Sequence, residues 1–305
     1  MTGDRIAVID LGSNTFHLLV CEITGRGMWK EICKERAYVK LASGGLNIID
    51  EASQQRAVDA MVRFMQIISA HAVKRTRAIG TAALREAKNG PDLAEKLEGI
   101  TGIPIEIIDG ADEAAYILKG IRAAMPEIPH PGLVMDIGGG SVEFILYKGD
   151  EIYFAQSFKI GMAVLFRKFH RSDPLSPEEL QEAESFLEEE LRPMTEFVSA
   201  YDTFSLVGAS GAFEVLRDIL PKINDGVKWA ELDMGPMQAH LDAIIRTSYE
   251  ERRKMGTIPG ERLDYIVMAY VLIRFVTRCT RPEGLYFCDF ALKEGVVVEM
   301  IEFLD

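Results

Sequence analysis

One sequence pattern occurs twice in the 305-residue chain, and it limits the possible folds more than any other feature. The first copy, residues 7–20, reads AVIDLGSNTFHLLV, and the second, residues 133–146, reads LVMDIGGGSVEFIL. Each copy has an apolar run ending near an aspartate (Asp10 or Asp136), a glycine-containing turn and a second apolar run. Short apolar runs on both sides of such a turn are typical of two buried strands joined by a hairpin. The duplication therefore predicts two related domains that face each other across a cleft.

The residues after each copy support the same reading, because strand-like and helix-like patterns alternate in a similar order. In the first half we expect strands at 29–35, 77–80 and 105–108, and helices at 53–71, 82–97 and 110–124. In the second half we expect strands near 133, 142, 152, 204–207 and 284–287, and helices near 162, 177, 212–220, 261–278 and from about 292. This alternation predicts an α/β fold with a mixed sheet in each half. We place the domains at 1–124 and 125–305, and the C-terminal helix, about 294–305, is free to pack back on the first domain.

Composition excludes several classes of protein. The net charge is −13, which argues against nonspecific nucleic-acid binding and requires metal ions or local cations if the substrate is a polyanion. No apolar run has the length of a membrane helix, and charged residues near the N-terminus interrupt any signal-peptide pattern. The four cysteines lack the CxxC spacing of zinc sites, and we expect buried free thiols. These features predict a cytoplasmic protein with no membrane and no nucleic acid among its partners.

The two glycine turns are the first candidates for chemistry. Their backbone N–H groups, from Gly12, Ser13, Asn14 and from Gly138, Gly139, Gly140 and Ser141, can form anion-binding concavities. Asp10 and Asp136 occupy equivalent positions, and one or both can hold Mg²⁺, which uses few carboxylates in proteins. The alternative is that both aspartates only cap their turns.

A third segment, residues 107–115, reads IIDGADEAA and places acids in the first turn of an expected helix. Asp112 and Glu113 are the acids of interest there. By spacing alone, such acids serve as often as caps or as partners of the helix dipole. The residues themselves leave these two roles open.

Five stretches together resemble a known family: DLGSN at 10–14, GTAALREA at 80–87, GADEA at 110–114, DIGGGSVE at 136–143 and GASGA at 208–212. In this order they are similar to the exopolyphosphatase/guanosine pentaphosphate phosphatase family, over nearly the whole chain. That family is a branch of the actin-like superfamily, so the resemblance implies two actin-like (ribonuclease H-like) domains. It also implies hydrolysis of phosphoanhydride bonds in inorganic polyphosphate or guanosine pentaphosphate, with Mg²⁺ (or Mn²⁺) as cofactor.

The resemblance assigns roles to matching positions. It implies that Glu113 activates the attacking water, with Asp112 as a supporting acid. It implies that Asp136 holds the metal, that Glu143 belongs to the metal–water shell, and that Asp10 lies at the equivalent position of the first domain. It implies phosphate binding by Gly138, Gly139, Gly140, Ser141 and Arg85, and the turn at 208–211 resembles one that contacts nucleotide. The full set of phosphate-binding candidates, including those proposed from the first glycine turn, is Gly12, Ser13, Asn14, Arg85, Gly138, Gly139, Gly140, Ser141, Gly208 and Ser210.

Two other functions stay open. A guanosine-phosphate-binding regulator with little turnover fits the same scaffold, as does a small-molecule kinase of the same superfamily. The acids in the third stretch and the intact DIGGGS favour the hydrolase. The preference between the two substrates and the choice between a monomer and a homodimer are not decided by the sequence.

Overall fold

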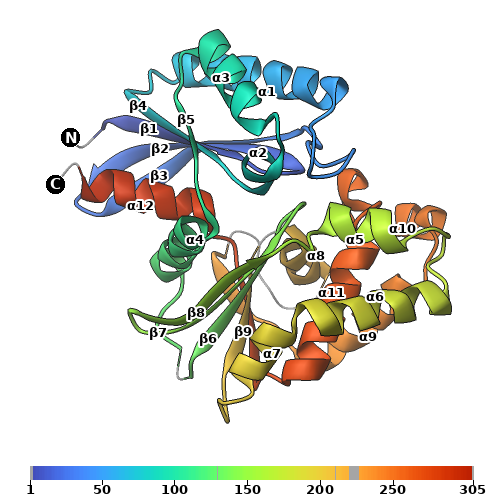
Figure 1. Cartoon of the computed structure of the whole chain (residues 1–305). Helices are drawn as coiled ribbons and strands as arrows, with labels where there is room; N and C mark the ends of the chain where they lie inside the picture. Colours follow the sequence, from blue (N-terminus) through green and yellow to red (C-terminus); the bar gives the residue numbers. More distant parts are fainter. Residues whose placement is uncertain (1–2, 129, 210, 220–226, 304–305) are drawn as a thin grey trace. The chain divides into compact units, whose positions relative to one another are not determined.

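The computed structural model describes residues 3–128, 130–209, 211–219 and 227–303. The chain forms two compact units (Figure 1). The first contains Met1–Ala123 and Phe290–Asp305, and the second contains Ala124–Asp289. The division therefore places the whole C-terminal helix with the first unit, although this helix follows the second unit in the sequence.

The sheet of the first unit has five strands in the order β3-β2-β1-β4-β5. Its strands are β1 (Arg5–Leu11), β2 (Thr15–Gly25), β3 (Met28–Tyr38), β4 (Arg75–Gly80) and β5 (Ile105–Ile107). Its helices are α1 (Glu51–Ala70), α2 (Ala82–Glu86), α3 (Gly90–Thr101), α4 (Gly110–Ala124) and α12 (Leu292–Glu302). Helices α1 and α3 lie on one face of this sheet, and α12 and α4 lie on the other (Figure 1).

The local sequence explains these helices. Helix α1 begins after Asp50, whose carboxylate accepts a hydrogen bond from the Ser53 N–H at 2.8 Å. Its buried residues Ala57, Met61 and Phe64 recur at helical spacing and pack on the sheet. A single expected helix over 82–97 is wrong, because α2 ends before Ala87 and α3 starts at Gly90.

Helices α4 and α12 approach each other through two glycines. A Cβ at Gly120 would lie 2.0 Å from the carbonyl oxygen of Ala291, and one at Gly295 would lie 1.9 Å from that of Tyr116. Only hydrogen fits at both positions. This close packing, supported by Glu299 of α12, fixes the middle of α4 against α12. The Oε2 atom of Glu299 accepts from the Tyr116 hydroxyl at 2.7 Å.

The second unit has a six-stranded sheet in the order β10-β11-β9-β6-β7-β8. Its strands are β6 (Gly132–Ile137), β7 (Val142–Lys148), β8 (Glu151–Phe158), β9 (Ser205–Ala209), β10 (Trp229–Glu231) and β11 (Gly284–Cys288). Its helices are α5 (Met162–Phe169), α6 (Pro177–Glu190), α7 (Arg192–Val198), α8 (Gly211–Ile219), α9 (Met234–Ile245), α10 (Tyr249–Met255) and α11 (Ile266–Thr280), with a 3₁₀ turn at Gly260–Arg262. The sequence did not predict α7, α9, α10 or β10, and the expected helix at 261–278 begins only at Ile266.

The topology repeats between the units. In both sheets the strand that carries the aspartate of the motif pairs antiparallel with the next strand in the sequence and parallel with a later strand. In the first unit Asp10 lies opposite His17 of β2 and beside Ile79 of β4. In the second unit Asp136 lies opposite Glu143 of β7 and beside Ala209 of β9. The internal repeat of the sequence is therefore a repeat of strand order.

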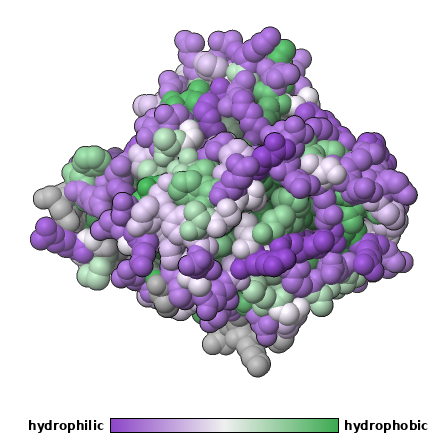
Figure 2. All heavy atoms as spheres, turned by 60° about the horizontal axis from the view of Figure 1, so that its bottom comes forward, coloured by the Kyte–Doolittle hydropathy of each residue, from purple (hydrophilic) through white to green (hydrophobic). Residues whose placement is uncertain are grey.

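An apolar stretch that is shorter than a membrane helix, residues 266–280, forms α11. Its residues from Ile266 to Thr277 are all buried in the second unit. No helix in the described ranges is long and apolar enough to cross a bilayer. Polar and charged residues cover most of the face in Figure 2, with apolar areas between them. All four cysteines are free thiols as expected, but Cys279 is exposed and Cys33 half-buried, so the expectation that all are buried is wrong.

Candidate functional site

The first glycine turn joins β1 to β2. Gly12 is sterically required there, because a Cβ would lie 2.8 Å from the Thr15 carbonyl oxygen. Two carbonyls of the turn are held by the following loop: that of Ser13 accepts from the Ala42 N–H at 3.0 Å, and that of Asn14 accepts from the Lys40 N–H at 2.8 Å. Ser13 itself is buried. The N–H groups of Gly12, Ser13 and Asn14 donate to no acceptor in the part of the chain that the structure describes.

The second glycine turn joins β6 to β7 and is closed by a hydrogen bond from the Gly138 N–H to the Ser141 carbonyl at 2.9 Å. Its other carbonyls bind the N-terminus of α5. Gly161, Met162 and Ala163 donate their N–H groups to the carbonyls of Gly140, Gly138 and Gly139, at 3.1, 3.0 and 2.9 Å.

The N–H groups on the other side of this second turn lack a protein acceptor among the described residues. Gly139, Gly140 and Ser141 are buried, and within residues 3–128, 130–209, 211–219 and 227–303 their N–H groups have no hydrogen-bond acceptor. Buried N–H groups are nearly always paired with protein, water or a ligand. Three such groups in successive residues are therefore suited to bind an anion.

Two carboxylates lie beside this turn. Asp136 and Glu143 face each other across β6 and β7, so their side chains share one face of the sheet. Glu143 is 2% exposed, and its Oε1 accepts a hydrogen bond from the Ser157 hydroxyl of β8 at 2.7 Å. The equivalent pair in the first unit is Asp10 and His17, so only the second unit has two carboxylates here.

These carboxylates fit a magnesium ion by their chemistry. Mg²⁺ is usually held by one or two carboxylates together with substrate phosphates and water, rather than by a complete protein cage. No group of three or more His, Cys, Asp or Glu residues suited to a metal exists among the residues described. The pair Asp136 and Glu143 agrees with this limited requirement.

An ion pair in the first unit joins Arg85 of α2 to the buried Glu113 of α4. Arg85 Nη1 donates to Glu113 Oε2 at 2.9 Å and to the Ile108 carbonyl at 3.0 Å. Glu113 is 6% exposed, and burial raises the pKa of its carboxyl above the ordinary value of 4.5 while Arg85 opposes the shift. In the described chain, Glu113 Oε1 accepts no hydrogen bond and Arg85 Nη2 donates none. One oxygen of the carboxylate is therefore available to a water molecule.

The neighbouring acids of this segment have other positions. Asp109 caps α4, because its Oδ1 accepts from the N–H groups of Ala111 and Asp112 at 2.8 and 2.9 Å. Asp112 is exposed, whereas Glu113, the next residue, is buried. Asp109 therefore serves as the cap of this helix. Of the two candidate acids, Asp112 lies at the surface and Glu113 lies in the interior.

The last glycine stretch follows β9. Gly208 has a packing reason for lacking a side chain, because a Cβ would lie 2.1 Å from the ring of Phe213 in α8. Arg262 donates hydrogen bonds to the Gly211 carbonyl and, at 2.6 Å, to Glu214 Oε2, which fixes the start of α8. Ser210 lies outside the described residues.

The structure thus groups the predicted residues within each unit. Arg85 and Glu113 meet in the first unit, and Asp136 and Glu143 lie near Gly138–Ser141 in the second. Sequence reasoning missed Ser157 and Gly161, which contact these groups from elements farther along the chain. A serine in a strand and a glycine before a helix are weak signals, so only the strand register and the helix contact reveal them.

The sequence and the fold of this chain are similar to those of known proteins. A family model described as the Ppx/GppA phosphatase family matches residues 19–303. The chain is 29% identical, over 97% of its length, to the guanosine-5'-triphosphate,3'-diphosphate pyrophosphatase of Vibrio parahaemolyticus. It spans 59% of the length of that relative.

Two solved structures share the fold. The crystal structure of an exopolyphosphatase from Cytophaga hutchinsonii is 32% identical, with a TM-score of 0.93 and 98% of both chains covered. A Ppx/GppA family member from Aquifex aeolicus is 24% identical, with a TM-score of 0.80 and 99% of both chains covered, and this likeness concerns the fold alone. The predicted α/β fold with two actin-like domains is confirmed.

Proposed function

Because this chain belongs to the Ppx/GppA phosphatase family, we propose that it releases terminal phosphate from inorganic polyphosphate, guanosine pentaphosphate or both. The observation that carries the proposal is the buried Glu113 carboxylate, held by Arg85 through one oxygen and open at the other. This is the arrangement that a general base for water requires.

Glu113 acts on the attacking water. Its Oε1 accepts a hydrogen bond from the water and takes its proton as the water oxygen bonds to the terminal phosphorus. The phosphoanhydride P–O bond breaks, and its electron pair stays with the shortened chain or nucleotide. A pKa raised by burial makes Glu113 a better proton acceptor than an exposed carboxylate. Asp112, which is exposed, is assigned only a supporting electrostatic role.

Backbone amides hold the phosphate. Phosphoryl transfer depends mainly on positioning and on stabilising charge, so N–H groups fixed toward the phosphoryl oxygens contribute directly. We assign this work to the turns at Gly12–Asn14 and Gly138–Ser141, whose N–H groups lack protein acceptors among the described residues. Arg85, whose Nη2 donates to no acceptor among the described residues, is a third candidate donor to phosphate. We also keep Gly208 and Ser210 as phosphate-binding candidates.

A divalent cation complements these groups. We assign Asp136 and Glu143, with Asp10 of the first unit, to hold Mg²⁺ or Mn²⁺. When bound with the substrate, this ion neutralises charge on the phosphoryl oxygens. It also answers the repulsion expected between a polyanion and a protein of net charge −13.

The relatives support a substrate with phosphoanhydride bonds, and their names differ in the substrate. One is named for guanosine pentaphosphate chemistry and covers more sequence than this chain, whereas the exopolyphosphatase structure matches the chain from end to end. The second comparison favours inorganic polyphosphate as the main substrate.

Phosphate release from three substrates tests the proposal. Short polyphosphate, long polyphosphate and guanosine pentaphosphate are compared, each with Mg²⁺ and with EDTA. We expect release from at least one of them, abolished by EDTA. Tight binding of guanosine tetraphosphate without phosphate release from any substrate would replace the hydrolase with a regulator. Formation of ADP from ATP with a sugar or acetate would instead support a small-molecule kinase.

A further inference from the structure

The N-terminus of α5 is bonded entirely to the second glycine turn. Three successive N–H groups of this helix start, from Gly161, Met162 and Ala163, donate to the three successive carbonyls of Gly138–Gly140. The first N–H groups of a helix have no partner within the helix, and they often bind anions or caps. Here the protein's own turn satisfies them.

This contact decides which way the turn amides face. Each carbonyl belongs to the same peptide plane as the next residue's N–H, and in a trans peptide the two groups point in opposite directions. Since the carbonyls of residues 138–140 face α5, the N–H groups of Gly139, Gly140 and Ser141 face away from it. These are the three buried N–H groups for which the described part of the chain offers no acceptor. Donation to a peptide carbonyl also polarises that peptide, which strengthens its N–H as a donor.

Gly161 makes the contact sterically possible. A Cβ at this position would lie 2.5 Å from the carbonyl carbon and oxygen of Gly139 and 2.5 Å from the carbonyl carbon of Gly140. All three atoms are backbone, so no side-chain rotation relieves the overlap. The backbone of Gly161 is extended, with φ −61° and ψ 166°, which any residue adopts. Position 161 therefore requires glycine because the turn leaves no space for a Cβ, and not because of its backbone conformation.

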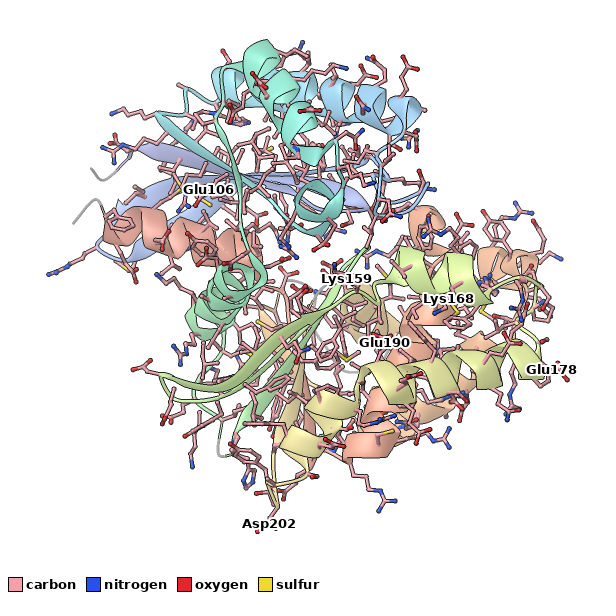
Figure 3. All side chains as sticks on the ribbon, in the orientation of Figure 1. Glu106, Lys159, Lys168, Glu178, Glu190 and Asp202 are labelled. Carbon is pink, nitrogen blue, oxygen red and sulfur yellow. The ribbon has the colours of Figure 1, made fainter. Side chains whose placement is uncertain are left out.

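The helix that makes this contact is anchored. Leu165 and Phe169 of α5 are buried in the core of the second unit, and α5 packs against α6 and α11. Lys168 extends toward α6, with its Nζ 3.5 Å from the centroid of the Phe186 ring (Figure 3). Lys159, labelled in the same figure, lies just before the helix on the segment that leads from β8. The start of α5 is thus a fixed surface against which the turn is set.

We propose that Gly161, with the N-terminus of α5, is a positioning element that aims the amides of residues 139–141 at the substrate phosphate. Gly161 contacts backbone and not substrate, so it acts through the turn. This inference rests on the proposed function, because it concerns the same phosphate site, and it adds the reason why this turn is preorganised.

Gly161→Ala is the direct test, and Gly260→Ala is its matched control. Gly260 lies in the same unit, and a Cβ there meets no heavy atom within 4 Å. Displacement of reacting groups by about 1 Å costs roughly 10²-fold in rate. We expect Gly161→Ala to lower kcat/KM for phosphate release by about 10²-fold, with kcat affected as well as KM, and Gly260→Ala to leave it unchanged. Circular dichroism and thermal unfolding establish that both variants are folded.

A second pair removes one contact without adding a Cβ at 161. Met162 is the first residue of α5 and follows an extended residue, so proline fits the helix there but has no N–H for the Gly138 carbonyl. Met162→Ala removes the side chain and keeps the N–H. We expect Met162→Pro to lower kcat/KM about five- to tenfold below Met162→Ala, the worth of roughly one hydrogen bond.

Amide NMR separates this inference from the proposed function. Inorganic phosphate is titrated into ¹⁵N-labelled protein, and the signals of Gly139, Gly140 and Ser141 are followed. We expect them to shift in the wild type and in Gly260→Ala, and to lose this response in Gly161→Ala and Met162→Pro. If the wild type neither responds nor releases phosphate, the proposed function is wrong. If the wild type does both and the two variants match their controls, the role of Gly161 is refuted.

Discussion

Replacing Glu113 with glutamine tests the central residue with the smallest change in shape. The substitution removes the negative charge and the proton-accepting capacity but keeps an amide oxygen that can accept from Arg85 Nη1, now 2.9 Å from Glu113 Oε2. If Glu113 is the general base, phosphate release should fall by about 10²–10⁴-fold. That loss corresponds to roughly 3–5 kcal/mol of transition-state stabilisation.

The same change should have little effect on stability. Replacing a charged hydrogen bond by a neutral one loses about 1 kcal/mol. Glu113 is 6% exposed, however, so the variant also avoids the cost of burying an ionised carboxylate. Burial is the first cause of the raised pKa of this group, so the cost of burying the charge opposes the gain from the charged hydrogen bond. We therefore expect the free energy of unfolding to change by no more than about 1 kcal/mol at neutral pH.

The assay combines phosphate release with urea unfolding and the phosphate titration. Glu95→Gln makes the same chemical change at an exposed position of α3 and should leave activity and stability unchanged. A Glu113→Gln protein that is folded, binds phosphate and retains near-normal turnover would remove Glu113 from the mechanism. Loss of phosphate binding together with turnover would show instead that the residue serves mainly to hold Arg85.

Three further predictions concern pH, metal and packing. The pKa of Glu113 is raised above 4.5 in the folded protein, so the contribution of this group to stability is complete below pH 4.5 and is lost as the pH rises through the folded pKa. Urea unfolding should therefore show the free energy of unfolding of Glu113→Gln rising relative to that of the wild type over this pH range. Ser157→Ala removes a donor from the buried Glu143 and should raise the Mg²⁺ concentration for half-maximal phosphate release by about 10-fold or more, while an unchanged Mg²⁺ dependence would contradict this role. Gly295→Ala places a Cβ 1.9 Å from a carbonyl of α4 and should lower the free energy of unfolding by about 1–3 kcal/mol. Gly99→Ala, at a position of α3 where a Cβ meets no heavy atom within 4 Å, should raise the free energy of unfolding by about 0.5–1 kcal/mol. Equal changes in the free energy of unfolding for the two substitutions, measured by urea unfolding, would refute the packing argument.

The sequence predicted the sheets of both units well because their strands are short apolar runs between glycine turns. The repeat at residues 7–20 and 133–146 became two strand pairs in equivalent positions, and the register placed Asp10 and Asp136 alike. It predicted the helical region after Pro177 less well. Helices α7, α9 and α10 were missed. Helices α7 and α9 pack on α11, a contact that the sequence does not show. Helix α10 has signals that the sequence does contain, a capping box from Ser248 and Glu251 and a left-handed Gly256 at its end.

The sequence by itself determined the candidate chemistry: which residue types are present, how they repeat, and that Asp112 and Glu113 lie in the first turn of a helix. Periodicity and turn residues act locally, so they are readable without a structure. Only the tertiary structure decided that Arg85 pairs with Glu113, that Ser157 binds Glu143, and that the start of α5 faces the turn at Gly138–Gly140. These contacts join residues 14 to 28 positions apart through strand register and helix packing. The elements that carry these side chains and amides are held in place by burial of apolar surface. Spacing along the chain does not specify that burial, so it does not specify the directions of these groups.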